Sequence, residues 1–144
     1  MSAPRIRDMT AADAPRVAAL LGQLGYPSPA ASVPERLARM MAERTSLVVV
    51  AELDGAITGV AAGHVTQAIT SDEPLAFLMA LVVDEGSRGS RVGRALVAHV
   101  EAWAKQEGAH KLQVLTATYR EAAHRFYEHL GYQKNGYRYI RTLE

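Results

Sequence analysis

The chain has 144 residues, 49% of them hydrophobic and 22% charged, which favours one globular domain and argues against a disordered segment. The formal net charge of +1 gives no reason to expect a nucleic acid or an anionic membrane as a partner, so any basic binding surface must be local. The chain has no cysteine, which excludes disulfides, thiolate metal sites and a cysteine nucleophile.

The first 45 residues are predicted to form a short strand and two helices. The opening residues lack the apolar segment of a signal peptide, and no run approaches the roughly 18 apolar residues of a membrane span, so we expect a cytoplasmic protein. Residues 4–9 alternate like a strand, and Thr10 and Asp13 have the spacing of a capping box. An amphipathic helix should follow and end at Gly25. A proline-rich loop, residues 26–34, then leads into a second helix.

Three strand-like runs come next. Residues 46–53 and 56–66 are joined by Asp54 and Gly55, a pair that is among the strongest short-range hairpin signals. A polar break, residues 70–74, separates this hairpin from a third run at residues 76–84.

The C-terminal part alternates helices and strands. It is predicted to contain a helix from about residue 91 to 107, a strand at 111–116, a helix at 121–130 and a strand at 137–143. Hairpins come first and a β-α-β crossover later. The fold class is therefore α/β of the α+β kind, with a mixed, largely antiparallel sheet and helices on both faces.

The loop EGSRGSRVGRAL, residues 85–96, combines three arginines with three glycines between a strand and a helix. Backbone amides that no side chain shields, together with the positive end of the helix dipole, form an anion site suited to phosphate or pyrophosphate. The spacing fits neither the Walker A motif nor the dinucleotide fingerprint. A plain turn with a solvated basic rim remains the alternative on spacing alone.

With its flanks, the loop resembles the signature of the GNAT superfamily of acyl-CoA-dependent N-acetyltransferases. The strand, loop and helix read LVVDEGSRGSRVGRALV at residues 81–97, and a second family element reads AHRFYEHLGY at residues 123–132. The resemblance covers nearly the whole chain and implies a GNAT-like acyl-CoA N-acyltransferase fold with one N-acetyltransferase domain over residues 1–144. It also implies transfer of an acetyl group from acetyl-CoA to a primary amine of a small molecule or protein, by direct attack through a tetrahedral intermediate.

The resemblance assigns the cofactor to the end of the strand and to the loop. The strand backbone would pair with the pantetheine arm, and the loop amides would hold the CoA pyrophosphate. The residues concerned are Leu81, Val82, Val83, Arg88, Gly89, Ser90, Arg91, Val92, Gly93 and Arg94. Arg91 stands where the family has a glycine; we expect it in the first helical turn, where no positive φ is needed.

Tyr127 is the residue that the resemblance makes catalytic, as the general acid that protonates the departing CoA thiolate. A core tyrosine beside Phe126 would show the same pattern. A backbone N–H near Val82 or Val83 would polarise the thioester carbonyl. The general base stays open between His64, a water molecule and an acidic residue. The acidic candidates are Asp72, Glu73 and Glu52.

Departures from the family pattern leave alternatives open. Met79 and Ala80 stand where a carboxylate is common, so a catalytically silent CoA-binding sensor or regulatory module is the alternative function. Arg120 replaces a frequent asparagine, and both its role and that of His124 stay open. The histidines lack metal-ligand spacing, so we expect no metal. We expect neither nucleic acid nor membrane as a partner; a homodimer is compatible with the family.

Overall fold

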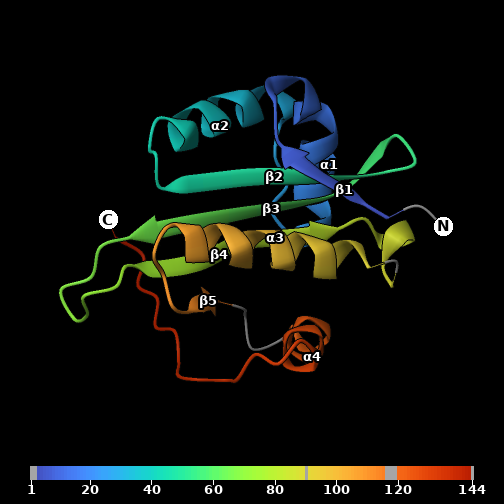
Figure 1. The fold of residues 1–144 in the computed structure, drawn as a ribbon. Coiled ribbons are helices and arrows are strands. Elements are labelled where there is room, and N and C mark those ends of the chain that lie inside the picture. The colour runs from blue at the N-terminus through green and yellow to red at the C-terminus, as the bar shows by residue number, and fades with distance from the viewer. Residues whose placement is uncertain (1–2, 90, 116–119, 144) are drawn as a thin grey trace. The chain divides into compact units, whose positions relative to one another are not determined.

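The computed structural model describes residues 3–89, 91–115 and 120–143. In this part of the chain one sheet has the strand order β1-β2-β3-β4-β5 (Figure 1). The strands are β1 (Arg5–Asp8), β2 (Ser46–Leu53), β3 (Ala56–Thr66), β4 (Leu75–Val83) and β5 (Leu112–Val114). The helices are α1 (Ala14–Leu24), α2 (Val33–Met41), α3 (Val92–Gln106) and α4 (Glu121–His129), with short 3-10 turns η1 (Ala11–Asp13), η2 (Ala30–Ser32) and η3 (Glu85–Ser87).

The sheet is mixed, as the sequence predicts. β1 pairs antiparallel with β2, β2 with β3, and β3 with β4. The chain reaches β5, next to β4, through α3, which is the connection of a β-α-β unit. The hairpin prediction is confirmed: Asp54 and Gly55 both have positive φ, 52° and 82°, as a tight turn between twisted strands requires. The strand expected at residues 111–116 is shorter, and residue 116 lies outside the described residues.

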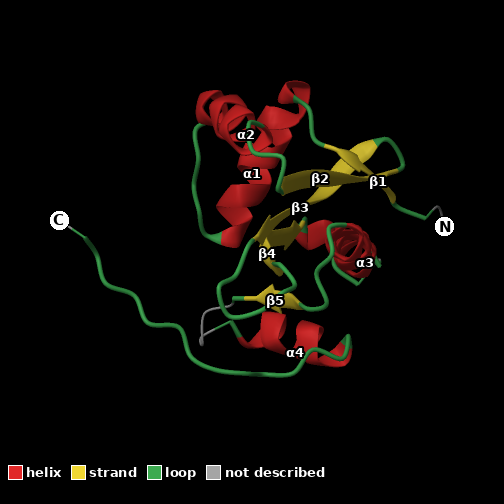
Figure 2. Ribbon diagram, turned by 60° about the vertical axis from the view of Figure 1, so that its left-hand side comes forward, coloured by secondary structure: helices red, strands yellow, loops and turns green. Residues whose placement is uncertain are grey.

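Helices cover both faces of the sheet. α1 and α2 pack on one face, and α3 lies on the other (Figures 1 and 2). Val50 and Val60 belong to the core beneath α1 and α2. On the α3 face the sheet carries glycine: a Cβ on Gly59 would lie 2.9 Å from Leu96 Cδ1, and one on Gly63 would lie 2.9 Å from Trp103 Cζ3. The glycines therefore let α3 approach the sheet closely.

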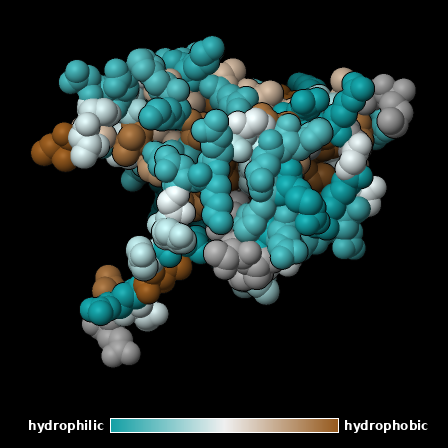
Figure 3. Space-filling view, turned by 90° about the horizontal axis from the view of Figure 1, so that it is seen from below, coloured by the Kyte–Doolittle hydropathy of each residue, from teal (hydrophilic) through white to brown (hydrophobic). Residues whose placement is uncertain are grey.

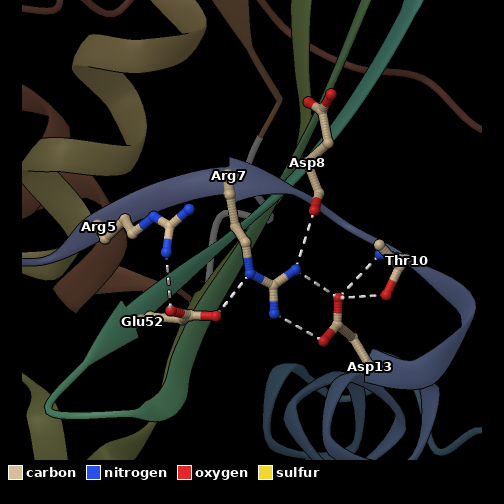
Figure 4. A network of polar contacts seen from close by, with 6 residues as sticks. All are labelled: Arg5, Arg7, Asp8, Thr10, Asp13 and Glu52. Atoms are coloured by element: carbon tan, nitrogen blue, oxygen red, sulfur yellow. Dashed lines mark hydrogen bonds and ion pairs between the residues drawn. The ribbon is translucent and has the colours of Figure 1, made fainter.

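An ion-pair network joins β1, η1 and β2 (Figure 4). Arg7 donates two hydrogen bonds to the Asp13 carboxylate, at 2.8 and 2.9 Å, and a third to Glu52 at 2.6 Å. Asp13 also accepts the backbone N–H of Thr10 at 2.8 Å, which is one half of the predicted capping box. These contacts hold the pKa of Asp13 down to about 2.

Contacts divide the chain into two units, Met1–Gln113 and Val114–Glu144. In the second unit the edge of the Tyr127 ring meets Phe126 and Tyr132, with centroids 5.1 and 5.7 Å apart. Gly131, with φ 96°, ends α4, and Tyr132 N–H donates back to the Tyr127 carbonyl.

The predicted final strand at residues 137–143 is wrong. These residues form no strand in the described structure, although their sequence alternates. Tyr137, Tyr139 and Leu143 are 86%, 91% and 88% exposed. Alternation supplies a face for a strand, but a strand also needs a neighbouring backbone for its N–H and C=O groups, and none is paired with this segment in the described residues.

The surface seen in Figure 3 is mostly hydrophilic, with hydrophobic residues in small patches. No helix in the described part of the chain is both long and apolar enough to cross a bilayer. The residues that the structure describes also contain no cluster of three or more His, Asp or Glu side chains that could hold a metal ion.

Candidate functional site

The loop between β4 and α3 is built from a turn followed by two left-handed residues. Asp84 directly follows β4 and caps η3, its carboxylate accepting the Gly86 N–H at 3.2 Å. Gly89 and Arg91 then have φ values of 85° and 70°. Ser90, a predicted cofactor residue between them, lies outside the described residues.

The expected backbone conformation of Arg91 is wrong. Arg91 is the N-cap of α3 and has φ 70° and ψ 1°, which is left-handed. It does not lie in the first helical turn, because helical φ and ψ begin only at Val92. A side chain with a Cβ is strained there, which explains why a glycine fits this position of the motif.

The first loop amides are occupied by the loop's own turn. Glu85 N–H donates to Gln23 Oε1 at 3.0 Å, Gly86 N–H to Asp84, and Ser87 N–H to the Asp84 carbonyl at 2.8 Å. They are therefore unavailable to a ligand.

The first turn of α3 supplies the amides that remain. Among the described residues, the first backbone hydrogen bond of this helix runs from Ala95 N–H to the Arg91 carbonyl at 3.0 Å. The N–H groups of Val92, Gly93 and Arg94 therefore have no acceptor within the helix. Together with the helix dipole, amides of this kind can donate hydrogen bonds to an anion.

Three exposed arginines add charge to this helix end. Arg88, Arg91 and Arg94 are all exposed. The Nε of Arg88 donates to the carbonyl of Val83 at 3.4 Å, so this side chain runs back to the end of β4. All the described loop residues predicted for the cofactor belong to the same unit as β4.

Two residues of α1 tie this loop to the helical layer, and sequence reasoning missed both. Gln23 Nε2 donates to Asp84 Oδ1 at 2.8 Å, and Arg16 Nη2 lies 3.1 Å from the same oxygen. Arg16 also donates to the carbonyl of Ile57 on β3 at 2.9 Å. These hydrogen bonds, from Gln23 first and Arg16 next, lower the pKa of Asp84. In sequence, both residues read only as the polar face of an amphipathic helix.

The β3–β4 ladder is interrupted close to the predicted pantetheine strand. Leu81 and Val82 face Ala61 and Val60 in regular register. Leu78 pairs with Gly63 and Ala80 with Ala62, so Met79 has no partner on β3, and its side chain is 59% exposed. An extra residue of this kind is a β-bulge, which bends a strand and interrupts its hydrogen bonding.

The predicted base candidates have different surroundings. His64 is half-buried on β3, with Nδ1 3.3 Å from the hydroxyl of Ser46. Glu52 accepts a hydrogen bond from Arg7 Nε at 2.6 Å. Glu73 Oε1 lies 3.8 Å from His110 Nδ1 beside a hollow of about 310 Å³.

Tyr127 lies on α4, in the second unit. Its side chain is partly buried, and burial raises the pKa of the phenol to about 12, against a smaller opposing effect of the Arg120 charge. The phenol therefore stays protonated at physiological pH. The loop belongs to the first unit, and the catalytic role of Tyr127 stays a prediction.

Known proteins resemble this chain in sequence. Residues 12–132 match the family model of the acetyltransferase (GNAT) family. An aminoglycoside N(6')-acetyltransferase type 1 of Stenotrophomonas maltophilia is 36% identical over 115 residues, covering 77% of this chain and 74% of that protein. An aminoalkylphosphonate N-acetyltransferase of Salmonella typhimurium is 30% identical over 90 residues. That match covers 62% of this chain but only 58% of the relative's length.

Solved structures share the fold. A transcriptional regulator from Bacillus halodurans superposes with a TM-score of 0.87 at 24% identity, covering 98% of this chain and all of the other. The aminoglycoside N-acetyltransferase AAC(6')-Iy in complex with CoA superposes with a TM-score of 0.85 at 20% identity, covering 100% of this chain and 96% of that one. At these identities the likeness concerns the fold alone.

The family model covers most of the chain, and it includes both the loop and α4. The resemblance predicted from the two motifs is thereby confirmed, together with the fold class and the class of acetyl-CoA-dependent N-acetyltransferase at family level. The chain belongs to the GNAT family of acetyltransferases.

Proposed function

We propose that the protein transfers the acetyl group of acetyl-CoA to a primary amine of a small molecule. The observation that carries the proposal is the helix end after β4. The amides of Val92–Arg94 have no intrahelical acceptor there, and three exposed arginines surround them. A doubly charged pyrophosphate fits this donor set better than a neutral ligand does. Family membership adds independent support.

The cofactor would lie along the predicted residues. The loop residues Arg88, Gly89 and Ser90 and the amides of α3's first turn would hold the pyrophosphate. The end of β4, at Leu81, Val82 and Val83, would pair with the pantetheine arm. The bulge at Met79 supports this assignment, because an irregular strand frees backbone groups for a ligand.

The reaction would be direct attack of the amine on the thioester carbonyl. The sequence has no cysteine, so a cysteine-linked acyl-enzyme cannot form. A β4 backbone N–H would stabilise the tetrahedral oxyanion. His64 or a water molecule would take the proton of the amine; the Ser46 hydroxyl beside Nδ1 supports His64, because it orients the ring.

Tyr127 would donate a hydrogen bond to the sulfur as the C–S bond breaks. A phenol with a pKa of about 12 is a weaker acid than a thiol, whose ordinary pKa is about 8.5. Complete transfer of its proton to the thiolate is therefore uphill. The pKa favours stabilising the charge that develops on sulfur over early protonation.

The acceptor class is proposed from the relatives. One acts, by its name, on aminoglycosides and the other on aminoalkylphosphonates, and both are small polar amines. Only amine acetylation in general follows from the family, so the choice of a small molecule over a protein amino group belongs to this proposal.

The remaining sequence predictions stay proposals. The chain would work as one N-acetyltransferase domain over residues 1–144, in the cytoplasm. A homodimer is supported by the exposed apolar residues of the C-terminal segment, Tyr137, Tyr139, Ile140 and Leu143. Light scattering of the parent and of Tyr139→Asp would test it. We expect a dimer that the charge weakens, and a monomeric parent would contradict it.

Turnover of acetyl-CoA with a panel of amines tests the function. The panel should include aminoglycosides, aminoalkylphosphonates, polyamines and a lysine peptide, with release of free thiol as the readout. We expect thiol release with at least one small amine. If the parent binds acetyl-CoA but acetylates no member of the panel, the silent CoA-binding module becomes the better description.

A further inference from the structure

We propose that Gln23 of α1 is a positioning residue for the loop between β4 and α3, and that it sets the affinity for the diphosphate of acetyl-CoA. The inference rests on the proposed function, because it takes the loop to hold the diphosphate of acetyl-CoA. Gln23 itself lies outside the predicted site. Gln23 joins two groups that are adjacent in sequence, the Asp84 carboxylate at the end of β4 and the Glu85 N–H at the start of η3.

The geometry uses both ends of one side-chain amide. Nε2 donates to Asp84 Oδ1 at 2.8 Å, and Oε1 accepts the Glu85 N–H at 3.0 Å. Two hydrogen bonds from a planar group fix the orientation of their partners as well as their distance. Arg16, two turns earlier on the same helix, reaches the same Asp84 oxygen at 3.1 Å.

Asp84 transmits this constraint to the loop. Its Oδ2 accepts the Gly86 N–H and its carbonyl accepts the Ser87 N–H, so one residue organises the whole η3 turn. Arg88 follows this turn directly, and from there the proposed pyrophosphate donors begin. A change in the Asp84 rotamer would therefore shift the backbone at Arg88, where the proposed pyrophosphate donors begin.

The position of Gln23 argues for a role beyond folding. Its side chain is exposed, and hydrogen bonds between exposed groups contribute little to stability. The core side chains of α1, such as Val17 and Leu20, are buried and attach the helix to the sheet without it. Gln23 is thus placed to affect ligand affinity much more than the free energy of unfolding.

Gln23→Leu separates the two effects because it removes both hydrogen bonds at similar volume. The matched control is Gln106→Leu, the same change at an exposed residue in the last turn of α3. Binding of acetyl-CoA is measured by calorimetry, and binding of S-acetylpantetheine, which carries the thioester but no diphosphate, by NMR titration. Thermal unfolding without ligand reports stability.

We expect Gln23→Leu to weaken the binding of acetyl-CoA about 5- to 20-fold, because the loop would no longer be held in place to donate hydrogen bonds to the charged ligand. Gln23→Leu should bind S-acetylpantetheine with an affinity within about twofold of the parent's. Gln106→Leu should change the affinity for neither ligand. Gln23→Glu is the second variant: glutamate suits a helix, but its charge beside Asp84 should also weaken acetyl-CoA.

Three results would overturn the inference. One is unchanged acetyl-CoA affinity in both Gln23 variants, and another is an equal loss for both ligands, which would indicate a merely structural role. The third is a parent that binds neither ligand, which would also refute the proposed function. The parent measurement therefore distinguishes failure of the function from failure of Gln23's role alone.

Discussion

Arg91 has a left-handed backbone, φ 70°, at the N-cap of α3, in a loop whose other described left-handed residue is Gly89. The left-handed region costs a residue with a Cβ about 1–2 kcal/mol, and β-branched residues more. We expect Arg91→Gly to be at least as stable as the parent and Arg91→Val to lose about 1–2 kcal/mol in urea unfolding.

The same pair of variants also bears on the ligand. Because glycine keeps the left-handed backbone, Arg91→Gly should bind acetyl-CoA within about tenfold of the parent, the loss being that of one exposed charge. Complete loss of binding would mean that the loop register is misassigned, and a stable Arg91→Val would contradict the strain.

Tyr127 leads to a prediction for the pH dependence of the reaction rate. With its pKa raised to about 12, the phenol donates a hydrogen bond at all lower pH values and loses the proton only as pH rises through about 12. The rate should show no alkaline limb from Tyr127 below about pH 11. Tyr127→Phe should lower kcat roughly 10²- to 10³-fold, as the loss of one donor to a developing charge does, with a profile of the same shape. Tyr139→Phe, on the exposed segment, is the control. An alkaline limb near pH 9 that disappears in Tyr127→Phe would contradict the assignment.

At the scale of elements, the contact of α3 with the sheet depends on two glycines. A Cβ on Gly63 would lie 2.9 Å from the Trp103 ring, so Gly63→Ala should destabilise the fold by about 1–3 kcal/mol through overpacking. Gly22 on α1 has nothing within 4 Å of such a Cβ, so Gly22→Ala should instead stabilise by about 0.4–1 kcal/mol. Chemical denaturation compares them, and equal effects of the two substitutions would argue against this packing.

The network between β1, η1 and β2 makes stability depend on acid. The pKa of Asp13 is lowered to about 2, so its contribution to stability is complete above the unfolded value near 4 and is lost as pH falls through about 2. Allowing for partial solvent screening, the contribution is about 1–2 kcal/mol at neutral pH. Asp13→Asn should be less stable than the parent by about this amount at pH 6, and the difference should shrink to about a third of it at pH 2.5. Asp72→Asn, in an exposed loop, should show no such convergence, and a pH-independent difference for Asp13→Asn would refute the linkage.

At the scale of the whole molecule, the sequence predicted what local pattern determines. Periodicity located α1, α3 and α4, and Asp54-Gly55 located the hairpin, because both signals depend on a few neighbouring residues. The predicted final strand at residues 137–143 was wrong, because a strand depends on a partner that is distant in sequence. The local pattern does not show whether such a partner is present. It also missed Gln23, which is polar on an exposed helix face and gains its contacts only when β4 passes beside α1. The conformation of Arg91 was missed because the motif fixes backbone geometry while the residue type there departs from it.

Ligand-linked unfolding tests whether the chain works as one domain. The family motifs assign residues of both contact units to one reaction, the loop in Met1–Gln113 and Tyr127 in Val114–Glu144. A ligand that binds only the native state stabilises it by about 2.7 kcal/mol at one hundred times its dissociation constant. We expect one thermal transition that acetyl-CoA raises, reported equally by Trp103 fluorescence in the first unit and by hydrogen exchange of α4 in the second. Hydrogen exchange of α4 that acetyl-CoA leaves unchanged, while the Trp103 transition rises, would mean that the second unit folds apart from the cofactor site. In that case Tyr127 could not be the residue that assists the leaving thiolate.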